Sequence, residues 1–322
     1  MARMRSLLCK AACLLLAFTT YAAAQDYPTK PVRIVVPFPP GAVNDFVGRI
    51  LATELSERLG KQFIVENRAG AGGVTGAEHV ANAPKDGYTF LIVSQATAVN
   101  PWLRKLPYDP ANAFVPVGVV LTAPNAVVAH PSVPANSIKE LIALAKSKPG
   151  QLQYASSGVG TFLHLGGELF KIMAGVDILH VPFKGAAPAM IDVVGGHTQL
   201  AFASATTAMT HIRSGKLKAL AVGGHRRSPT LPDVPTVAEA GVPGYHAANW
   251  VGLVAPAGTP PEIIARLHKE ITEIQNMPKV QQQITNAGGE ILRMSVAEFG
   301  AFQASELAKW GKVVKEAKIP AQ

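Results

Sequence analysis

Short runs of β-branched and other apolar residues alternate along the chain with stretches that repeat apolar residues at helical spacing. The run Val32 to Val36 is followed by such a stretch over residues 46–59, which ends at Gly60. Continuous apolar strands that alternate with amphipathic helices are typical of a parallel sheet covered by helices on both faces. The sequence therefore predicts an α/β protein.

The same alternation continues to the end of the chain. The expected strands are 32–36, 63–65, 88–93, 117–121, 126–129, 152–155, 178–181, 199–203, 217–222 and 250–255. The expected helices are 46–59, 76–83, 137–146, 162–173, 188–194, 208–214, 261–274, 279–286 and 296–315. Pro124 separates two of the strands, and Ser137 with Glu140 predicts a capping box at one helix start.

The pattern starts again after residue 122, which predicts two α/β lobes. We place the first lobe at residues 26–122 plus 229–322 and the second at 123–228. The return of the C-terminal segment to the first lobe would make two segments cross between the lobes. Such crossings form a hinge, and the cleft beside a hinge is a usual place for a ligand.

The first 25 residues have the three parts of a secretory signal peptide. Basic residues precede the apolar run 11–18, and Ala22-Ala23-Ala24 supplies the small residues that a signal peptidase needs. The apolar run is shorter than the roughly 20 residues that span a bilayer. A cleaved signal is therefore favoured over a membrane anchor, and we expect export to the periplasm.

Setting this segment aside changes the meaning of the charge and the cysteines. The chain has 30 basic and 21 acidic residues, a formal charge of +9. Residues 1–25 hold three of the basic residues and both cysteines, Cys9 and Cys13, so the remaining balance is 27 minus 21, or +6. A disulfide scaffold, a cysteine-ligated metal and a nucleic-acid partner are therefore not expected.

Two strand-to-helix loops have the composition of anion-binding sites. Glycine lets the backbone approach a ligand, and N–H groups at a helix start carry the positive end of the helix dipole. The candidate residues are Phe38, Pro40, Gly41 and Ala42 in one loop, and Ser156, Ser157, Gly158, Gly160 and Thr161 in the other. For either loop alone an ordinary capped turn is the simpler interpretation, but one loop from each lobe could grip a carboxylate from both sides.

Three other polar residues have two interpretations each. Asp45 would repel an anion, so we expect a structural cap at its helix start, with contact to a cationic ligand group as the alternative. Lys184 would either reach a ligand carboxylate or lie at the rim. His164 and Glu168 lie four residues apart and could hold a metal, but such a pair is more often structural, and we expect no metal.

Motifs for catalysis and for cofactors are scarce. The chain has no G-x-S-x-G, S-x-x-K or H-E-x-x-H sequence, and the glycines of residues 70–76 do not have dinucleotide-binding spacing. We therefore expect neither an enzyme nor a cofactor. A secreted hydrolase that uses Ser156 or Ser157 stays a remote alternative.

Many segments, in order, resemble the substrate-binding proteins of tripartite tricarboxylate transporters, the Bug family. The resemblance covers essentially the whole chain after the signal. The segments are Pro37–Gly41 with Asp45, Glu66–Arg68 with Gly70–Gly73, Tyr154–Gly158, Thr161 and His164 with Glu168–Lys171, His180–Gly185 with Pro188-Ala189, Leu231–Thr236 with Glu239–Gly241, and Trp250 with Ala255–Pro260.

The resemblance implies a type II periplasmic-binding-protein fold that closes on a small organic acid. It implies a ligand carboxylate held by backbone N–H groups, hydroxyls and bridging waters. We count His164 and Lys184 among the candidate ligand-binding residues. It also implies delivery to membrane permease subunits, or service to signalling partners in some relatives. We expect the protein to be a monomer.

The sequence departs from the family pattern at positions that leave the ligand's identity open. Ala42 stands where a second glycine is frequent, and Ala203 and Ser204 stand where the family often has a polar or acidic residue. Ser94 and Thr97 lie in a stretch that varies in the family and would tune selectivity.

Overall fold

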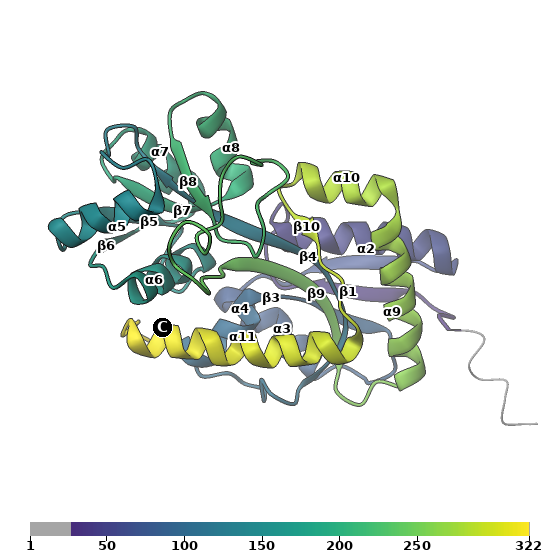
Figure 1. The fold of residues 1–322 in the computed structure, drawn as a ribbon. Helices are drawn as coiled ribbons and strands as arrows, with labels where there is room; N and C mark the ends of the chain where they lie inside the picture. The colour runs from purple at the N-terminus through teal and green to yellow at the C-terminus, as the bar shows by residue number, and fades with distance from the viewer. Residues whose placement is uncertain (1–26, 322) are drawn as a thin grey trace, which may run out of the picture.

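The computed structural model describes residues 27–321 and contains two α/β lobes (Figure 1). The expected signal peptide, with Cys9 and Cys13, lies outside the described residues. The strands are β1 Val32–Val36, β2 Phe63–Asn67, β3 Thr89–Ser94, β4 Phe114–Ala129, β5 Gln153–Ser156, β6 Leu179–Pro182, β7 Leu200–Ser204, β8 Lys218–Val222, β9 Ala248–Pro256 and β10 Glu290–Ile291.

The helices follow the predicted order, with one addition after β3. They are α2 Val43–Leu59, α3 Val74–Ala81 after a short 3-10 turn η1 Ala71–Gly73, α4 Gln95–Leu103, α5 Ile138–Ser147, α6 Phe162–Ala174, α7 Ala186–Val194, α8 Ala205–Arg213, α9 Pro261–Asn276, α10 Pro278–Asn286 and α11 Val296–Glu316. The predicted α/β fold with two lobes is confirmed, while α4 and β10 were not predicted.

The first lobe is built on the strand order β2-β1-β3-β9-β4, with β10 paired to β4. β1 is parallel to β2 and β3, whereas β9 runs antiparallel to both β3 and β4. The C-terminal segment therefore rejoins the first sheet after the chain has built the second lobe. The residue boundaries of the lobes stay a prediction.

β4 connects the two sheets. Its residues 114–124 pair with β9, and its residues 125–129 pair with β7 and β8 of the second sheet. The prediction of two strands separated by Pro124 is wrong, because the strand runs through this proline, which lies opposite Ala248. A proline is tolerated in a strand where its missing N–H is not needed for the ladder, and Pro124 lies where β4 leaves one sheet for the other.

The strand directions make the two sheets point their carboxyl ends at each other. Since β9 is antiparallel to β3 and to β4, the strands β1, β3 and β4 run in the same direction, toward the second lobe. β7 is antiparallel to β4, and β5 and β6 are parallel to β7, so these three run toward the first lobe. The helices that follow β1, β3, β5, β6 and β7 (α2, α4, α6, α7 and α8) therefore begin on the side that faces the other lobe.

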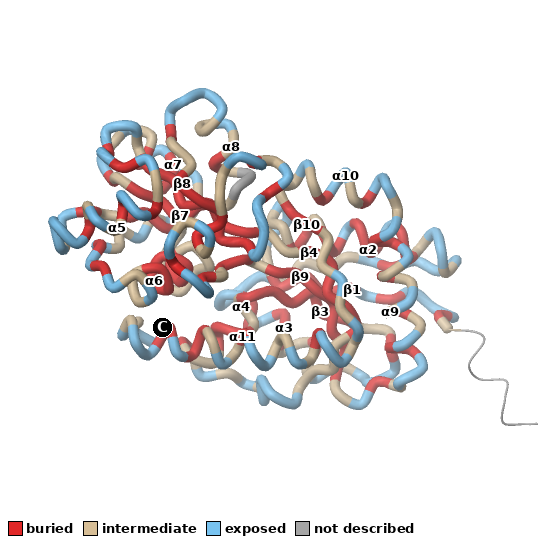
Figure 2. Tube along the Cα trace, in the orientation of Figure 1, coloured by how far each residue is buried: buried red, intermediate tan, exposed pale blue. Residues whose placement is uncertain are grey.

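The central strands of the two sheets, β4, β7 and β9, are mostly buried, as the red tube of Figure 2 shows. Ile34 and Val35, neighbours in β1, are each fully buried but belong to different cores on opposite faces. In the first lobe α2, α9 and α10 lie on one face and α3, α4 and α11 on the other. The long helix α11 contacts both α4 and α6, so it lies against both lobes.

Candidate functional site

Helix starts from both lobes gather where the two sets of strands face each other. The first lobe contributes the starts of α2 and α4, after β1 and β3, and the second those of α6, α7 and α8. Ser94, at the end of β3, pairs with Val251 of β9, and Val251 in turn pairs with Leu121 of β4. Ser204, at the end of β7, pairs with Asn125 of β4. Leu121 and Asn125 are four positions apart on β4, roughly 13 Å along the strand.

The loop between β1 and α2 is held by a buried carboxylate. Asp45 is 3% exposed and accepts hydrogen bonds from the Gly41 N–H (3.0 Å), the Arg49 Nε (2.9 Å) and the Asn67 Nδ2 (2.9 Å). The Arg49 hydrogen bond, with those from Gly41 and Asn67, lowers the pKa of Asp45 to about 2. Gly41 has a φ of +88°, which favours glycine at this turn.

These bonds decide which N–H groups of the first loop are left for a ligand. The Gly41 N–H already has an acceptor, and Phe46 N is the first to bond back into the helix, to the Ala42 carbonyl at 3.0 Å. Helix geometry leaves the Ala42 and Val43 N–H groups without an intrahelical acceptor, and both residues are partly exposed beside the exposed Pro40. Direct ligand contact at Phe38, Pro40, Gly41 and Ala42 stays a prediction.

The loop between β5 and α6 is bonded internally in the same way. Ser156 is 1% exposed, and its Oγ accepts from the Gly158 N–H at 3.1 Å. Thr161 caps α6 by accepting from the His164 N–H, and its hydroxyl donates to the Gly158 carbonyl at 2.7 Å. The N–H groups of Phe162 and Leu163, at the first two helical positions, have no intrahelical acceptor by their position.

Two histidines lie behind this loop. His164 Nδ1 accepts from the Gly160 N–H at 3.0 Å, and His180 Nε2 lies 2.6 Å from Ser156 Oγ. Their rings stack with centroids 3.9 Å apart. His164 is only 4% exposed, so the structure places it as support for the loop, and ligand contact through its ring stays a prediction.

The remaining predicted residues of the second lobe line its facing edge. Ser157 is partly exposed, and Lys184 is exposed in the turn before α7. Ser204 caps α8 and shares a 2.6 Å hydrogen bond with Thr207. Ser156, Ser204 and Thr207 also line a cavity of about 10 Å³, which is the space of one water molecule. Most of the other residues that line this small cavity are apolar.

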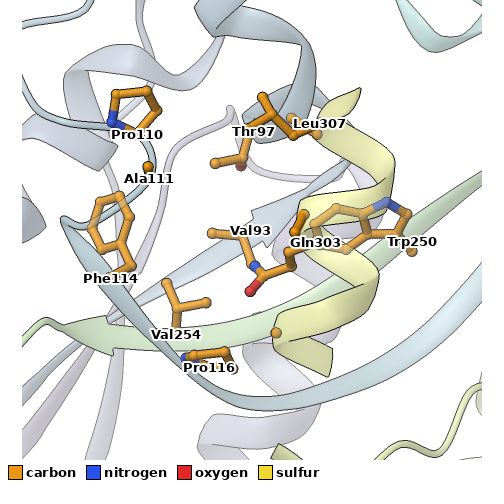
Figure 3. Close-up of a pocket in the computed structure, with 13 residues that line it drawn as sticks. Val93, Thr97, Pro110, Ala111, Phe114, Pro116, Trp250, Val254, Gln303 and Leu307 are labelled. Carbon is orange, nitrogen blue, oxygen red and sulfur yellow. The ribbon is translucent and has the colours of Figure 1, made fainter. Parts of the chain in front are cut away.

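Thr97 faces a different space. Its hydroxyl accepts from the Ser94 N–H at 3.4 Å in a capping box at the start of α4, and its side chain lines a cavity of about 240 Å³ between the first sheet and α11 (Figure 3). The other walls are mostly apolar, with Val93, Trp250 and Leu307 among them. An unpaired carboxylate would lose much of its hydration free energy there, so this cavity does not suit an anion.

The two lobes meet at a tightly packed crossing around Asn125. This side chain is fully buried, and its amide donates to the Tyr245 hydroxyl at 3.4 Å, which in turn donates to the Gly166 carbonyl at 3.0 Å. A methyl group on Gly223 would lie 1.9 Å from Asn125 Oδ1. The backbone of Asn125 also bonds Ala247 and Gly223, so both crossing segments are joined here.

Four polar residues near these helix starts were not among the predicted site residues. Asn67 is the last residue of β2, and its side chain donates a hydrogen bond to the Phe38 carbonyl of the first loop. His180 lies within β6, and its ring contacts Ser156 Oγ of the second loop. Asn44 and Gln95, 4% and 2% exposed, lie in the first turns of α2 and α4 with side-chain nitrogens that have no partner among the described residues. For Gln95, the signal available in the sequence was a polar residue directly after a parallel strand.

Comparison with known proteins places these features in a family. The family model described as "Tripartite tricarboxylate transporter family receptor" matches residues 47–319. The chain belongs to this family. It is also 36% identical to Protein BugT of Bordetella pertussis over 297 residues, which cover 91% of each chain.

Solved structures that are similar to this chain have the same fold. Rpa4515 of R. palustris with adipate is 37% identical, with a TM-score of 0.78 over 92% of this chain and all of that one. MatC of Rhodopseudomonas palustris with bound malate is 31% identical, with a TM-score of 0.72 over 89% of this chain and all of that one. A Polaromonas TctC solute-binding protein without ligand is 28% identical, with a TM-score of 0.81 over 90% and 99% of the chains.

Two further observations concern membranes and metals. Within residues 27–321 no helix is long and apolar enough to cross a bilayer. The same part of the chain holds no group of three or more histidine, cysteine or acidic residues that could bind a metal ion, and the pair His164 and Glu168 lies 4.0 Å apart.

Proposed function

We propose that this protein is a periplasmic receptor that captures a small organic carboxylate between its lobes and delivers it to the permease subunits of a tripartite tricarboxylate-type transporter. The observation that carries the proposal is the pair of loops, one from each lobe, whose helix starts face each other. The structures of Rpa4515 with adipate and of MatC with bound malate, both similar to this chain, support the ligand class.

The donors offered by the two loops suit a carboxylate. The outward N–H groups of Ala42 and Val43 in one lobe, and of Phe162 and Leu163 in the other, lie at the positive ends of two helix dipoles. Ser157 adds a hydroxyl, and Lys184 adds a positive charge at the rim. A few charge-assisted hydrogen bonds of about 1.5–3 kcal/mol each would account for a micromolar dissociation constant, about −8 kcal/mol.

A ligand that contacts both lobes only when they close would shift the population toward the closed state by its differential affinity.

A hydrolase is the second function to weigh, because Ser156 Oγ and His180 Nε2 lie 2.6 Å apart. A serine nucleophile must reach its substrate, and Ser156 is 1% exposed, with its Oγ already accepting from the Gly158 N–H. The pair is therefore better explained as loop support. Turnover of an ester panel that disappears in Ser156→Ala would reverse this conclusion.

The proposal is tested by a thermal-shift screen of the mature protein against mono-, di- and tricarboxylates, aromatic acids, amines and sugars. A ligand present at 100 times its dissociation constant adds about 2.7 kcal/mol to the stability. We expect shifts from dicarboxylates, and stabilisation by amines or sugars alone would overturn the carboxylate assignment.

Transport and signalling are separated by a deletion strain supplied with the acid found in the screen. Transport predicts that the strain loses uptake of the labelled acid and regains it with the wild-type gene. Normal uptake with lost induction of the uptake genes would instead show that the receptor serves a membrane signalling partner.

A further inference from the structure

Two stacked histidines join the second loop to the body of its lobe. His180 of β6 contacts Ser156 Oγ, at the beginning of the loop, and His164 of α6 accepts from the Gly160 N–H near its end. The rings are nearly parallel, with an angle of 17° between their planes, and the Tyr154 ring stacks on the other side of His180 with centroids 4.9 Å apart. Both ends of the loop therefore depend on this stack.

The Gly160 hydrogen bond fixes the protonation of His164. Nδ1 can accept a hydrogen bond only through a free lone pair, so the proton of the neutral ring is on Nε2, which lies 4.0 Å from Glu168 Oε1. In the imidazolium form both ring nitrogens are donors. Protonated Nδ1 would then face the Gly160 N–H, donor against donor, and this hydrogen bond would be lost.

The charges around the stack favour the neutral rings. Glu168 accepts from the Tyr154 hydroxyl at 2.7 Å and from Lys171 Nζ at 2.9 Å, so a lysine already balances its charge. Tyr245 is a further titratable side chain that acts on Tyr154. Burial first, and Lys171 second, lower the pKa of His164 to about 4. Burial, together with His164, lowers the pKa of His180 to about 4.

We propose that His164 is a positioning residue: its neutral ring holds Gly160, and thereby the start of α6, in the geometry that binds the ligand carboxylate, and proton uptake by the histidine pair releases both the loop and the ligand in acid. The carboxylate part of this proposal rests on the proposed function. The release of Gly160 does not, so the two can be tested separately.

The first test follows the Gly160 amide signal of the ligand-free protein by NMR between pH 7 and pH 4. In the wild type we expect it to move with the titration of His164. In His164→Asn the side-chain oxygen takes the place of Nδ1 and does not titrate in this range, so the Gly160 signal should stay near its neutral-pH position throughout. A Gly160 signal that is independent of pH in the wild type overturns the proposal whatever the variants do.

The second test compares adipate affinity in His164→Asn and His164→Gln, with His79→Asn in the first lobe as the control. The asparagine keeps an acceptor for Gly160, whereas the longer glutamine places its amide near the Nε2 position. At pH 7 we expect His164→Asn to bind like the wild type and His164→Gln to bind at least about tenfold more weakly. Below pH 5 the wild type should lose affinity faster than His164→Asn, a difference that the protonation of adipate itself cannot produce.

The outcomes separate this proposal from the proposed function. Equal losses in His164→Asn and His164→Gln at pH 7, or parallel pH profiles for His164→Asn and the wild type, overturn the positioning role. A wild type that binds no carboxylate at pH 7 overturns the proposed function, while the Gly160 signal still decides whether His164 holds the loop. If either variant fails to fold, the wild-type titration alone gives that decision.

Discussion

The side-chain amide of Asn67 donates to Asp45 Oδ1 at 2.9 Å and to the Phe38 carbonyl at 3.1 Å. A residue at the end of β2 thus fixes both the carboxylate in the first turn of α2 and the backbone of the loop before it. The negative charge of Asp45 is directed at partners inside the lobe, so it holds the loop in place without facing an anionic ligand.

Asp45→Ala should destabilise the protein by about 1–3 kcal/mol, because the Gly41 N–H and the Asn67 amide lose a buried acceptor. Arg49→Ala is the matched control, since Arg49 is 57% exposed and an exposed partner of an ion pair contributes about 0–1 kcal/mol. Urea unfolding of both variants at pH 7 measures the difference. Equal losses of unfolding free energy in the two variants would show that Asp45 stabilises the protein through its ion pair with Arg49 and not by holding the loop.

The free energy of unfolding should fall as the pH falls from about 6.5 toward 4. Burial is the first cause that lowers the pKa values of His164 and His180 to about 4 and of His246 to about 3, so in this window the unfolded chain, with histidine near 6.5, binds more protons. The stabilisation by Asp45 is lost in a lower window, from about 4 to about 2.

Urea unfolding between pH 7.5 and 4.5 measures this slope. The wild type should lose more than about 1 kcal/mol over the range, since one unit of pKa shift corresponds to 1.36 kcal/mol, and His164→Asn should lose less. A stability that stays level down to pH 4.5 would contradict the burial of neutral histidines.

Adjacent serines should behave differently when changed to alanine. Ser157→Ala removes a partly exposed hydroxyl that we assign to the ligand, so carboxylate affinity should fall about tenfold while the melting temperature stays unchanged. Ser156→Ala should lower the melting temperature, because it leaves the Gly158 N–H without its acceptor. The assignment fails if Ser157→Ala binds like the wild type and Ser156→Ala melts like it.

The crossing between the lobes should not tolerate a side chain at Gly223. A Cβ there would lie 1.9 Å from Asn125 Oδ1 and 2.6 Å from the Ala247 carbonyl, so Gly223→Ala should cost about 1–3 kcal/mol. In contrast, Gly300 of α11 has only an ordinary contact, 3.4 Å to Pro116, and Gly300→Ala should be neutral or stabilising by up to about 1 kcal/mol. Thermal unfolding of the two variants checks the contrast.

The sequence allowed most of the fold to be predicted because local patterns and their order agree. The apolar run of β1 is sufficient to predict a strand, and the helical spacing of α2 is sufficient to predict a helix. The repetition of this pair of patterns indicates an α/β protein. The continuity of β4 through Pro124 could not be predicted, because it depends on which sheet pairs with each half of the strand. α4 was missed because Pro101 lies inside it and its capping box uses Thr97 instead of an acidic residue.

The site could be predicted only as far as its loops. Glycine and serine after a strand indicated where helix starts approach a ligand, but not which N–H groups are already bonded within the lobe. The hydrogen bonds from Gly41 to Asp45 and from Gly160 to His164 each join a loop glycine to a side chain in the first turn of the next helix. They are visible only in the three-dimensional structure. The roles of Asn67 and His180 depend on neighbouring strands, which one sequence does not pair.

Hydrogen exchange of the mature protein, with and without the acid that gives the largest thermal shift, tests the central claim most directly. If the ligand is held by both lobes, amides of residues 38–46 and of residues 156–164 should both become more protected. Protection of only one of these segments, or protection confined to the cavity walls near Val93, Ala111 and Ala304, would contradict a carboxylate site between the two lobes.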